Sequence, residues 1–329
     1  MSFAAALRVE KAGPLALLQD GGRFGVRHLG ITQGGPMDWH AAGWANALLG
    51  NDPGAAVLEV AIGGLRLVAE AELTLSLCGA DLSATVNDQQ LRPWRRFTLQ
   101  AGDRLAFGMP RCGVRAYLGA CGGWRGVPAL GSVACVGREG FGGHKGGGLP
   151  LDDGDQLQPE ARSQPLSSYS CVPPEYQPDY GQPAELGVIP GGQTAFFDGA
   201  SLYEAFNAPW QVDTRADRMG IRLTGPELVC HHPGMVSEGL AAGAIQVPPD
   251  GQPICLMNDR QTIGGYPRLG TLTPLARARL AQCQTGETVR LRASGTERAR
   301  HEYSGAQKAI ASFRGHHLRA SGAAPYSGF

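Results

Sequence analysis

Short apolar runs separated by turn-forming residues recur along the whole chain and predict a protein built of many strands. The runs are rich in Val, Ile and Leu, which is typical of strands bounded by turns. Gly63-Gly64 and Asn87-Asp88 supply turn chemistry between or after such runs. The expected strands are VLEVAI (57–62), LRLVA (65–69), LTLSLC (73–78), LSATV (82–86), RLAFG (104–108), VRAYLGA (114–120), LGVIP (186–190), GIRLTG (220–225), AIQVP (244–248), ICLMN (254–258) and TVRL (288–291).

Two segments instead combine helical spacing with helix-capping residues. In DWHAAGWANALLGN, Asp38 is placed to cap the first turn and Gly50 to end the helix. A second helix is expected to begin at Thr273-Pro274. The apolar residues at helical spacing are Ala41, Trp44, Ala45 and Leu48 in the first helix, and Ala276, Leu280 and Cys283 in the second.

The length of 329 residues exceeds one typical core, so two domains are expected. Prolines punctuate a polar segment near residues 158–185, which is typical of a linker or a long crossing loop. We therefore predict a mainly β protein with two β domains. The predicted boundaries are 1–160 for the first domain, 161–185 for the linker, 186–296 for the second domain and 297–329 for a basic C-terminal tail. The tail is expected to be solvated, with an amphipathic turn around Ala306, Ile310 and Phe313 as the alternative.

Composition narrows the class further. The 49 glycines and 23 prolines are interleaved with the apolar runs, as expected for many strands and turns. The formal net charge is zero, which gives no electrostatic case for nucleic acid or an anionic membrane as a partner. No apolar run approaches the length of a membrane span, and the N-terminus lacks the basic flank of a signal peptide, so a cytoplasmic protein is expected.

Several familiar catalytic motifs are missing. The eight cysteines form no C-x-x-C pair, and the adjacent His231 and His232 would point to opposite faces of a strand, so no metal site is expected. The stretch GREGFGGHKGGGLP contains Lys145 without a following Ser or Thr, which favours a mobile glycine loop over a phosphate cradle. Neither G-x-S-x-G nor H-E-x-x-H occurs.

Two polar constellations lie near the N-terminus. In LQDGGRFG, Asp20 and Arg23 flank a double glycine, and the alternative to a binding role is a turn closed by a surface ion pair. In TQGGPMDWHAAGWAN, Gly34-Gly35 and Met37 precede a helix N-terminus whose free N–H groups could bind an anion or a carbonyl oxygen. Simple capping by Asp38 explains the second pattern equally well.

A third constellation is denser. The run from Asn258 to Thr262 joins an apolar strand to a double glycine, and MVSEGLAAGAIQVP precedes it. If AIQVP pairs with ICLMN, the polar residues of both segments converge at one end of a sheet. Carboxylates there are acceptors or bases, Arg260 is a planar donor fork, and Gly264-Gly265 would let a ligand approach backbone N–H groups. This set suits an amide, a ureide or a carboxylate better than a sugar or a metal.

These same segments resemble one family. LQDGGRFGVRHLG, GGPMDWHAAGWANALLGN, VLEVAIGG, GVRAYLGACGG, DRMGIRLTGPEL and SEGLAAGAIQVPPDGQPICLMNDRQTIGGYP are similar, in that order, to the biotin-dependent carboxyltransferase-like family. It is also called allophanate hydrolase subunit 2, or carboxyltransferase subdomains A and B. The resemblance runs from about Leu7 to Leu291 and implies β-barrel architecture with a cyclophilin-like C-terminal domain. QGGPMD and QTIGGY depart from the usual S-G-A-M-D and T-T-G-G-Y, which puts the exact substrate in doubt.

Among the family's activities, the resemblance favours ATP-dependent opening of 5-oxoproline to L-glutamate. The implied partners are a B-type, kinase-inhibitor-like subunit and an A-type 5-oxoprolinase subunit, with ATP as co-substrate. The implied catalytic residues are Asp259, Arg260, Gln261 and Glu238, and the implied substrate-binding residues are Ser237, Gln246, Thr262, Gly264, Gly265, Tyr266, Asp20, Arg23, Met37, Asp38 and Arg218. If Arg260 is an exposed site residue, its replacement by Ala should lower activity with little effect on melting.

Two alternatives stay open. A carboxyltransferase acting on a urea-like substrate would need carboxybiotin, yet the chain shows no A/V-M-K-M biotinylation site, so a separate carrier would have to supply it. A regulatory protein would bind and antagonise a histidine-kinase inhibitor and catalyse nothing.

Overall fold

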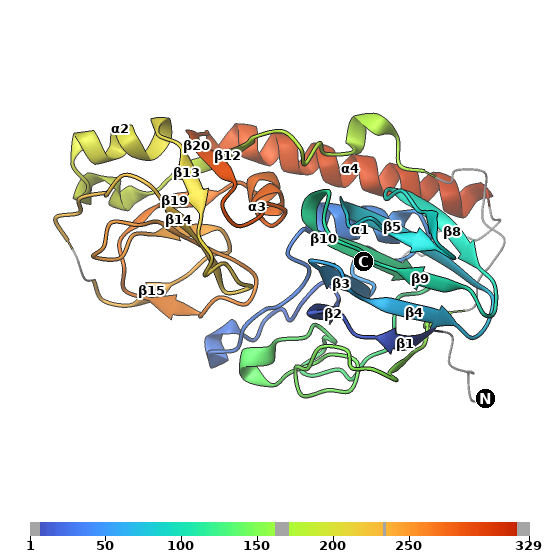
Figure 1. Ribbon diagram of the computed structural model, residues 1–329. Helices are drawn as coiled ribbons and strands as arrows, with labels where there is room; N and C mark the ends of the chain where they lie inside the picture. Colours follow the sequence, from blue (N-terminus) through green and yellow to red (C-terminus); the bar gives the residue numbers. More distant parts are fainter. Residues whose placement is uncertain (1–6, 162–170, 233–234, 321–329) are drawn as a thin grey trace. The chain divides into compact units, whose positions relative to one another are not determined.

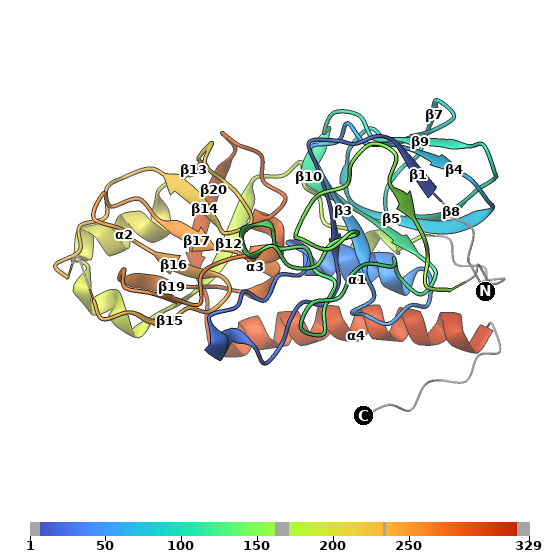
Figure 2. The ribbon, with the colours of Figure 1, turned by 90° about the horizontal axis from the view of Figure 1, so that it is seen from below.

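The computed structural model of the chain describes residues 7–161, 171–232 and 235–320, and it divides into two compact units (Figures 1 and 2). The first unit comprises residues 1–23, 34–179 and 306–329, and the second comprises residues 24–33 and 180–305. Residues 24–33 therefore belong with the C-terminal half, although they come early in the chain. Part of the predicted linker, residues 162–170, lies outside the described residues.

Two antiparallel sheets form the first unit, in the strand orders β11-β1-β4-β9-β6-β7 and β2-β3-β10-β5-β8. Their inward-facing leucines and valines, including Leu58, Leu75 and Leu118, are fully buried in one core. The strands are β1 (Leu7–Lys11), β2 (Leu15–Gln19), β3 (Val57–Ala61), β4 (Arg66–Ala69), β5 (Leu73–Asp81), β6 (Thr85–Val86), β7 (Gln89–Gln90), β8 (Arg95–Leu99), β9 (Arg104–Ala106), β10 (Cys112–Ala120) and β11 (Gln156–Leu157).

Helix α1 (Trp39–Ala47) belongs to the same unit and begins where the sequence predicts. The Asp38 carboxylate accepts hydrogen bonds from the backbone N–H groups of His40 and Ala41, at 3.1 and 3.0 Å. The capping interpretation of Asp38 is thus sufficient to explain its position before the helix. The short 3₁₀ helices η2 (Gly137–Glu139) and η3 (Pro174–Tyr176) are also in this unit.

A closed barrel forms the second unit, in the order β12-β19-β16-β17-β14-β13-β20 (Figure 2). Parallel pairing of β12 with β20 closes it. Strand β16 pairs with β17, with Ile245 opposite Cys255, which meets the condition set for the third constellation. Its strands are β12 (Ala184–Pro190), β13 (Trp210–Val212), β14 (Gly220–Thr224), β16 (Ala244–Gln246), β17 (Ile254–Leu256), β19 (Arg268–Leu272) and β20 (Thr288–Ala293), with a separate pair β15 (Glu238–Gly239) and β18 (Ile263–Gly264).

Helices also accompany the barrel. Helix α3 (Pro274–Leu280) begins at the predicted position, because the Thr273 hydroxyl accepts from the N–H of Ala276 at 3.2 Å. Helix α2 (Gly199–Asn207), capped by Asp198, was not predicted. The 3₁₀ helices η1 (Arg27–Leu29) and η4 (Gly192–Phe196) complete the unit.

The predicted mainly β class is therefore confirmed, and the C-terminal half contains a closed barrel. No helix in the described ranges combines the length and the apolar character that a membrane span requires. The eight cysteines all lie within the described residues, and none of them forms a disulfide.

The expectation of a solvated C-terminal tail is wrong. Residues Thr296–Ala320 form helix α4, drawn in red in Figure 1, and its residues from 306 onward belong to the first unit. Ile310 is only 6% exposed, and the Phe313 ring contacts the Trp44 ring edge-on, with centroids 5.3 Å apart. Ile310 and Phe313 are spaced so that they pack on one face of the helix, although the segment as a whole is rich in charged residues.

We expect Ile310→Ala to lower the free energy of unfolding by about 2–4 kcal/mol, because it empties a buried site beside α1. Exposed Lys308, on the same helix, is the control, and Lys308→Ala should change stability by less than about 0.5 kcal/mol. Urea denaturation of both variants measures the difference. Equal, small effects would mean that the helix does not pack in solution.

Candidate functional site

The polar run after β17 lies at one end of the barrel in the second unit, where it continues the pairing of β14 with β17. The N–H of Met257 donates to the carbonyl of Met219 at 2.9 Å, and that of Asp259 to the carbonyl of Arg218 at 2.8 Å. Arg218 and Asp259 therefore lie opposite each other, just beyond the ends of the named strands. The sequence placed both among the site residues, but gave no sign that they are neighbours.

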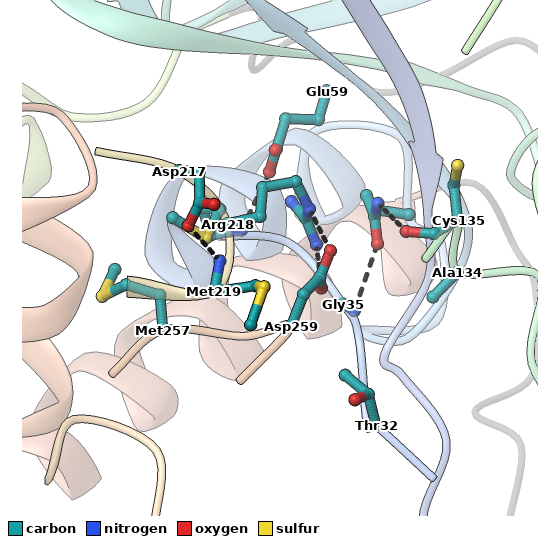
Figure 3. A network of polar contacts seen from close by, with 12 residues as sticks. Thr32, Gly35, Glu59, Ala134, Cys135, Asp217, Arg218, Met219, Met257 and Asp259 are labelled. Carbon is teal, nitrogen blue, oxygen red and sulfur yellow. Dashed lines mark hydrogen bonds and ion pairs between the residues drawn. The ribbon is translucent and has the colours of Figure 1, made fainter. Parts of the chain in front are cut away.

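Their side chains form a buried bidentate ion pair (Figure 3). The Arg218 Nε and Nη2 atoms donate to the two Asp259 oxygens, each at 2.9 Å. The two residues are 8% and 6% exposed. Asp217 orients the turn before β14, since its carboxylate accepts from the N–H groups of Met219 and Gly220 at 2.7 and 2.9 Å. The Asp259 carboxylate is thus a fixed structural acceptor as well as a candidate site residue.

Arg260 is buried, so the assumption that it is an exposed site residue is wrong. It is 4% exposed, and it donates from Nε to the carbonyl of Leu240 and from Nη1 to that of Met257, both at 3.2 Å. Burial, followed by the nearby charges of Arg27 and Arg277, lowers the pKa of Arg260 to about 9, while Asp259 acts in the opposite direction. Neither Arg27 nor Arg277 was singled out in the sequence, since no local motif links the three.

The exposed part of the site surrounds the small β15–β18 pair, in which Glu238 is opposite Gly264. Glu238 forms an ion pair with Arg268 and accepts from Gln193 Nε2 at 3.2 Å. Gln193 in turn accepts from the N–H of Arg268 at 2.8 Å. We name Ser237, Glu238, Arg268 and Tyr266 the rim. Its polar groups can bind a small ligand, because Ser237, Glu238 and Tyr266 are exposed.

The double glycine has a packing role that the sequence interpretation missed. A Cβ on Gly264 would lie 2.8 Å from a Leu240 methyl carbon and 2.9 Å from Gln246 Nε2, and one on Gly265 would lie 2.6 Å from the carbonyl oxygen of Met235. Neighbouring protein atoms, without any ligand, therefore exclude side chains here. Ligand approach is not needed to explain either glycine.

The remaining predicted residues of the second unit contribute unequally. Gln246 is 2% exposed, and its Nε2 donates to the carbonyl of Tyr266 at 3.5 Å. Thr262 contributes its backbone carbonyl, which accepts from the N–H of Leu240 at 2.9 Å and from Arg27 Nη2 at 3.2 Å. Gln261 is half-buried in the same loop.

In the first unit, Asp20 and Arg23 anchor one loop instead of closing a surface turn. Asp20 accepts from the Ser132 hydroxyl at 2.5 Å and from the N–H of Val133 at 2.8 Å. Arg23 is 1% exposed, and it donates to the carbonyls of Ala129 and Ala134 at 3.0 and 2.5 Å. These hydrogen bonds give Asp20 and Arg23 a structural role that requires no ligand.

A buried network next to α1 includes Met37 and two residues that the sequence analysis did not select. Glu59 accepts from the N–H of Met37 at 2.8 Å and from the Tyr117 hydroxyl at 2.9 Å. The hydroxyl of Tyr117 also accepts from the N–H of Asp38 at 2.8 Å. Burial, and then the Glu59 carboxylate, raise the pKa of Tyr117 well above its usual range, so the phenol stays neutral. Glu59, a single glutamate within the apolar strand VLEVAI, was the sequence signal that could have revealed this buried network.

Gln19 extends this network of the first unit. Its amide donates to the carbonyl of Cys135 at 2.9 Å and accepts from the N–H of Gly35 at 3.1 Å. The double glycine at 34–35 is thus held by protein groups. Within the described residues, no group of three or more His, Cys, Asp or Glu side chains is arranged to hold a metal ion, and His231 and His232 are both exposed.

Comparison with solved structures defines the class of protein first. The chain superposes on the urea amidolyase of Kluyveromyces lactis with a TM-score of 0.87 and 26% identity, over 95% of this chain and 20% of that one. It therefore spans about a fifth of that enzyme's length. The urea carboxylase of the same organism matches with the same TM-score and identity, over 30% of its chain. The architecture is that of a carboxyltransferase-type module.

Sequence comparison then gives the family. The family described as carboxyltransferase domain, subdomain A and B, matches residues 29–293, and the chain belongs to it. The chain is 36% identical to the C-type subunit of 5-oxoprolinase from Escherichia coli, over 86% of this chain and 89% of that protein. It is 33% identical to the corresponding protein of Haemophilus influenzae, over 86% of this chain and 90% of that protein. The resemblance of the quoted segments is confirmed.

We expect Asp259→Asn to lower the free energy of unfolding by about 3–5 kcal/mol, because it removes the negative partner from a buried bidentate ion pair. Glu302→Gln breaks the mostly exposed Arg298–Glu302 pair, and it should cost less than about 0.5 kcal/mol. Urea denaturation distinguishes them. A cost for Asp259→Asn as small as that of the control would refute a structural role for the pair.

Gly265→Ala should lower the melting temperature by several degrees even without ligand, since the new methyl group meets the Met235 carbonyl. Gly239→Ala is the matched control on the neighbouring strand, where a Cβ would have no atom within 4 Å. Thermal melting of the two variants provides the measurement. Unaltered melting of Gly265→Ala would restore the idea that the glycine serves only a ligand.

Proposed function

We propose that the chain is one subunit of an ATP-dependent 5-oxoprolinase, which opens 5-oxoproline to L-glutamate together with B-type and A-type partner subunits. One observation carries the proposal: two proteins named as the C-type subunit of 5-oxoprolinase match at 36% and 33% identity over nearly their whole length. The match over nearly the whole length favours this assignment over the urea enzymes, because the chain covers only a small part of those much longer proteins.

The chemistry of the proposed reaction explains why a polar barrel end is useful. A lactam carbonyl is a poor electrophile, so the γ-phosphoryl group of ATP is transferred to its oxygen and ADP leaves. Water then attacks the carbonyl carbon, and the ring C–N bond breaks as the nitrogen takes a proton. A second water cleaves the resulting acyl phosphate, which releases glutamate and phosphate. The protein must hold the ring in position and stabilise negative charge on the reacting oxygen.

In this proposal the rim binds the ring amide. Glu238 is its exposed carboxylate and can accept a hydrogen bond from the ring N–H, while the Ser237 hydroxyl can donate to the ring carbonyl. Gln193 and Arg268 fix the Glu238 side chain. The buried Arg218–Asp259 pair supports the loop from below without contacting the substrate.

A second candidate is a carboxyltransferase that uses carboxybiotin and a urea-like substrate. The observation that favours it is the superposition on the K. lactis urea enzymes at a TM-score of 0.87. Urea and the 5-oxoproline ring both present a carbonyl beside an N–H, so the same rim suits either substrate.

We expect the purified chain alone to show no 5-oxoproline hydrolysis, and 5-oxoproline-dependent release of phosphate and glutamate to appear when both partner subunits are added. Glu238→Gln in that mixture should reduce the rate, whereas Asp250→Asn, at an exposed carboxylate paired with Arg222, should not. Robust turnover by the chain alone contradicts the assignment as one part of a complex. Carboxylation of urea from carboxybiotin, with no 5-oxoproline turnover, would establish the second candidate instead.

A further inference from the structure

The barrel of the second unit concentrates positive charge where little negative charge balances it. Arg27, Arg218, Arg260 and Arg277 are grouped around the loop after β17, whereas Asp259 is the carboxylate that acts on Arg260. Both oxygens of Asp259 already bind Arg218. Among these five residues, no second carboxylate balances the positive charges of Arg27, Arg260 and Arg277.

Hydrogen bonds place two of the three close together. Arg27 Nη2 and Arg260 Nε both donate to the carbonyl oxygen of Leu240, the second at 3.2 Å. Arg27 also donates to the Thr262 carbonyl at 3.2 Å. Carbonyl dipoles satisfy these donors, but they do not neutralise two cations that meet at one oxygen atom.

Arg277 completes the group from helix α3. It is half-buried, and its Nε atom is buried with no hydrogen-bond partner in the described structure. Burial lowers the pKa of Arg277, and the charge of Arg277 in turn lowers the pKa of Arg260. A buried guanidinium donor without an acceptor is unfavourable unless a ligand supplies one.

We propose that Arg27, Arg260 and Arg277 form a binding site for a small oxyanion, a carboxylate or a phosphate group. A planar guanidinium fork can donate two parallel hydrogen bonds to two oxygens of either group. Arg27 and Arg277 are half-buried, so a ligand can reach them from the surface, while Arg260 forms the floor. Assigning the oxyanion to the carboxylate of 5-oxoproline rests on the proposed function, whereas the existence of the site does not.

Titration calorimetry on the full chain tests this with three probes: 5-oxoproline, 2-pyrrolidinone, which is the same ring without the carboxylate, and inorganic phosphate. Arg277→Gln should weaken anion binding by about tenfold or more, because it removes one charged donor. Arg277→Lys should retain part of the affinity. Arg300→Gln makes the same charge change at an exposed position of α4 and should bind as the wild type does.

Melting temperature gives a second readout that a purely structural arginine would not produce. Without anion, Arg277→Gln should melt at the wild-type temperature or above, since it relieves repulsion between like charges. Added anion should stabilise the wild type and leave the variant unchanged. A lower melting temperature of the anion-free variant would contradict the charge argument.

The outcomes separate the site from the proposed function. Binding of 5-oxoproline that depends on Arg277, with no comparable dependence for 2-pyrrolidinone, supports the site and assigns it to the substrate carboxylate. Binding of phosphate alone, lost in Arg277→Gln, supports the site and assigns it to a phosphate group. The inference is overturned if neither anion binds the wild type, or if Arg277→Gln binds both unchanged.

Discussion

The bidentate pair between Arg218 and Asp259 is the interaction on which the candidate site depends. It joins the turn before β14 to the loop after β17, and a backbone hydrogen bond between the same two residues reinforces it. Removing either charge would break a buried ion pair, which is far more costly than losing a surface pair. The loop that carries Arg260 and Thr262 is therefore held in place by a contact that need not touch a substrate.

The arginines around that pair differ in how their charges are balanced. The Asp259 carboxylate binds the Arg218 guanidinium, whereas Arg27 and Arg260 donate to backbone carbonyls. Backbone acceptors explain why the side chains are ordered, but not why so many cations were placed together. Burial lowers the pKa of Arg27, Arg260 and Arg277 alike, and for Arg260 the nearby charges of Arg27 and Arg277 lower it further.

The candidate residues of the first unit behave differently. Asp20, Arg23 and Asp38 are each engaged with backbone groups of their own unit, and Met37 is wholly buried. These contacts account for their presence without a ligand. A motif shared with a family can thus mark positions needed for folding as well as positions that meet substrate, and only the contacts tell which is which.

The sequence by itself determined the mainly β class, most strand positions and the capped starts of α1 and α3, because these follow from local periodicity and capping chemistry. It also indicated which loop is unusually polar. Tertiary structure alone decided that Arg260 is buried, that Gly265 is packed against Met235, and that residues 24–33 belong to the second unit. Burial and charge balance depend on residues far apart in the chain: Arg27, Arg260 and Arg277 meet only after the barrel closes, so no local pattern could reveal them.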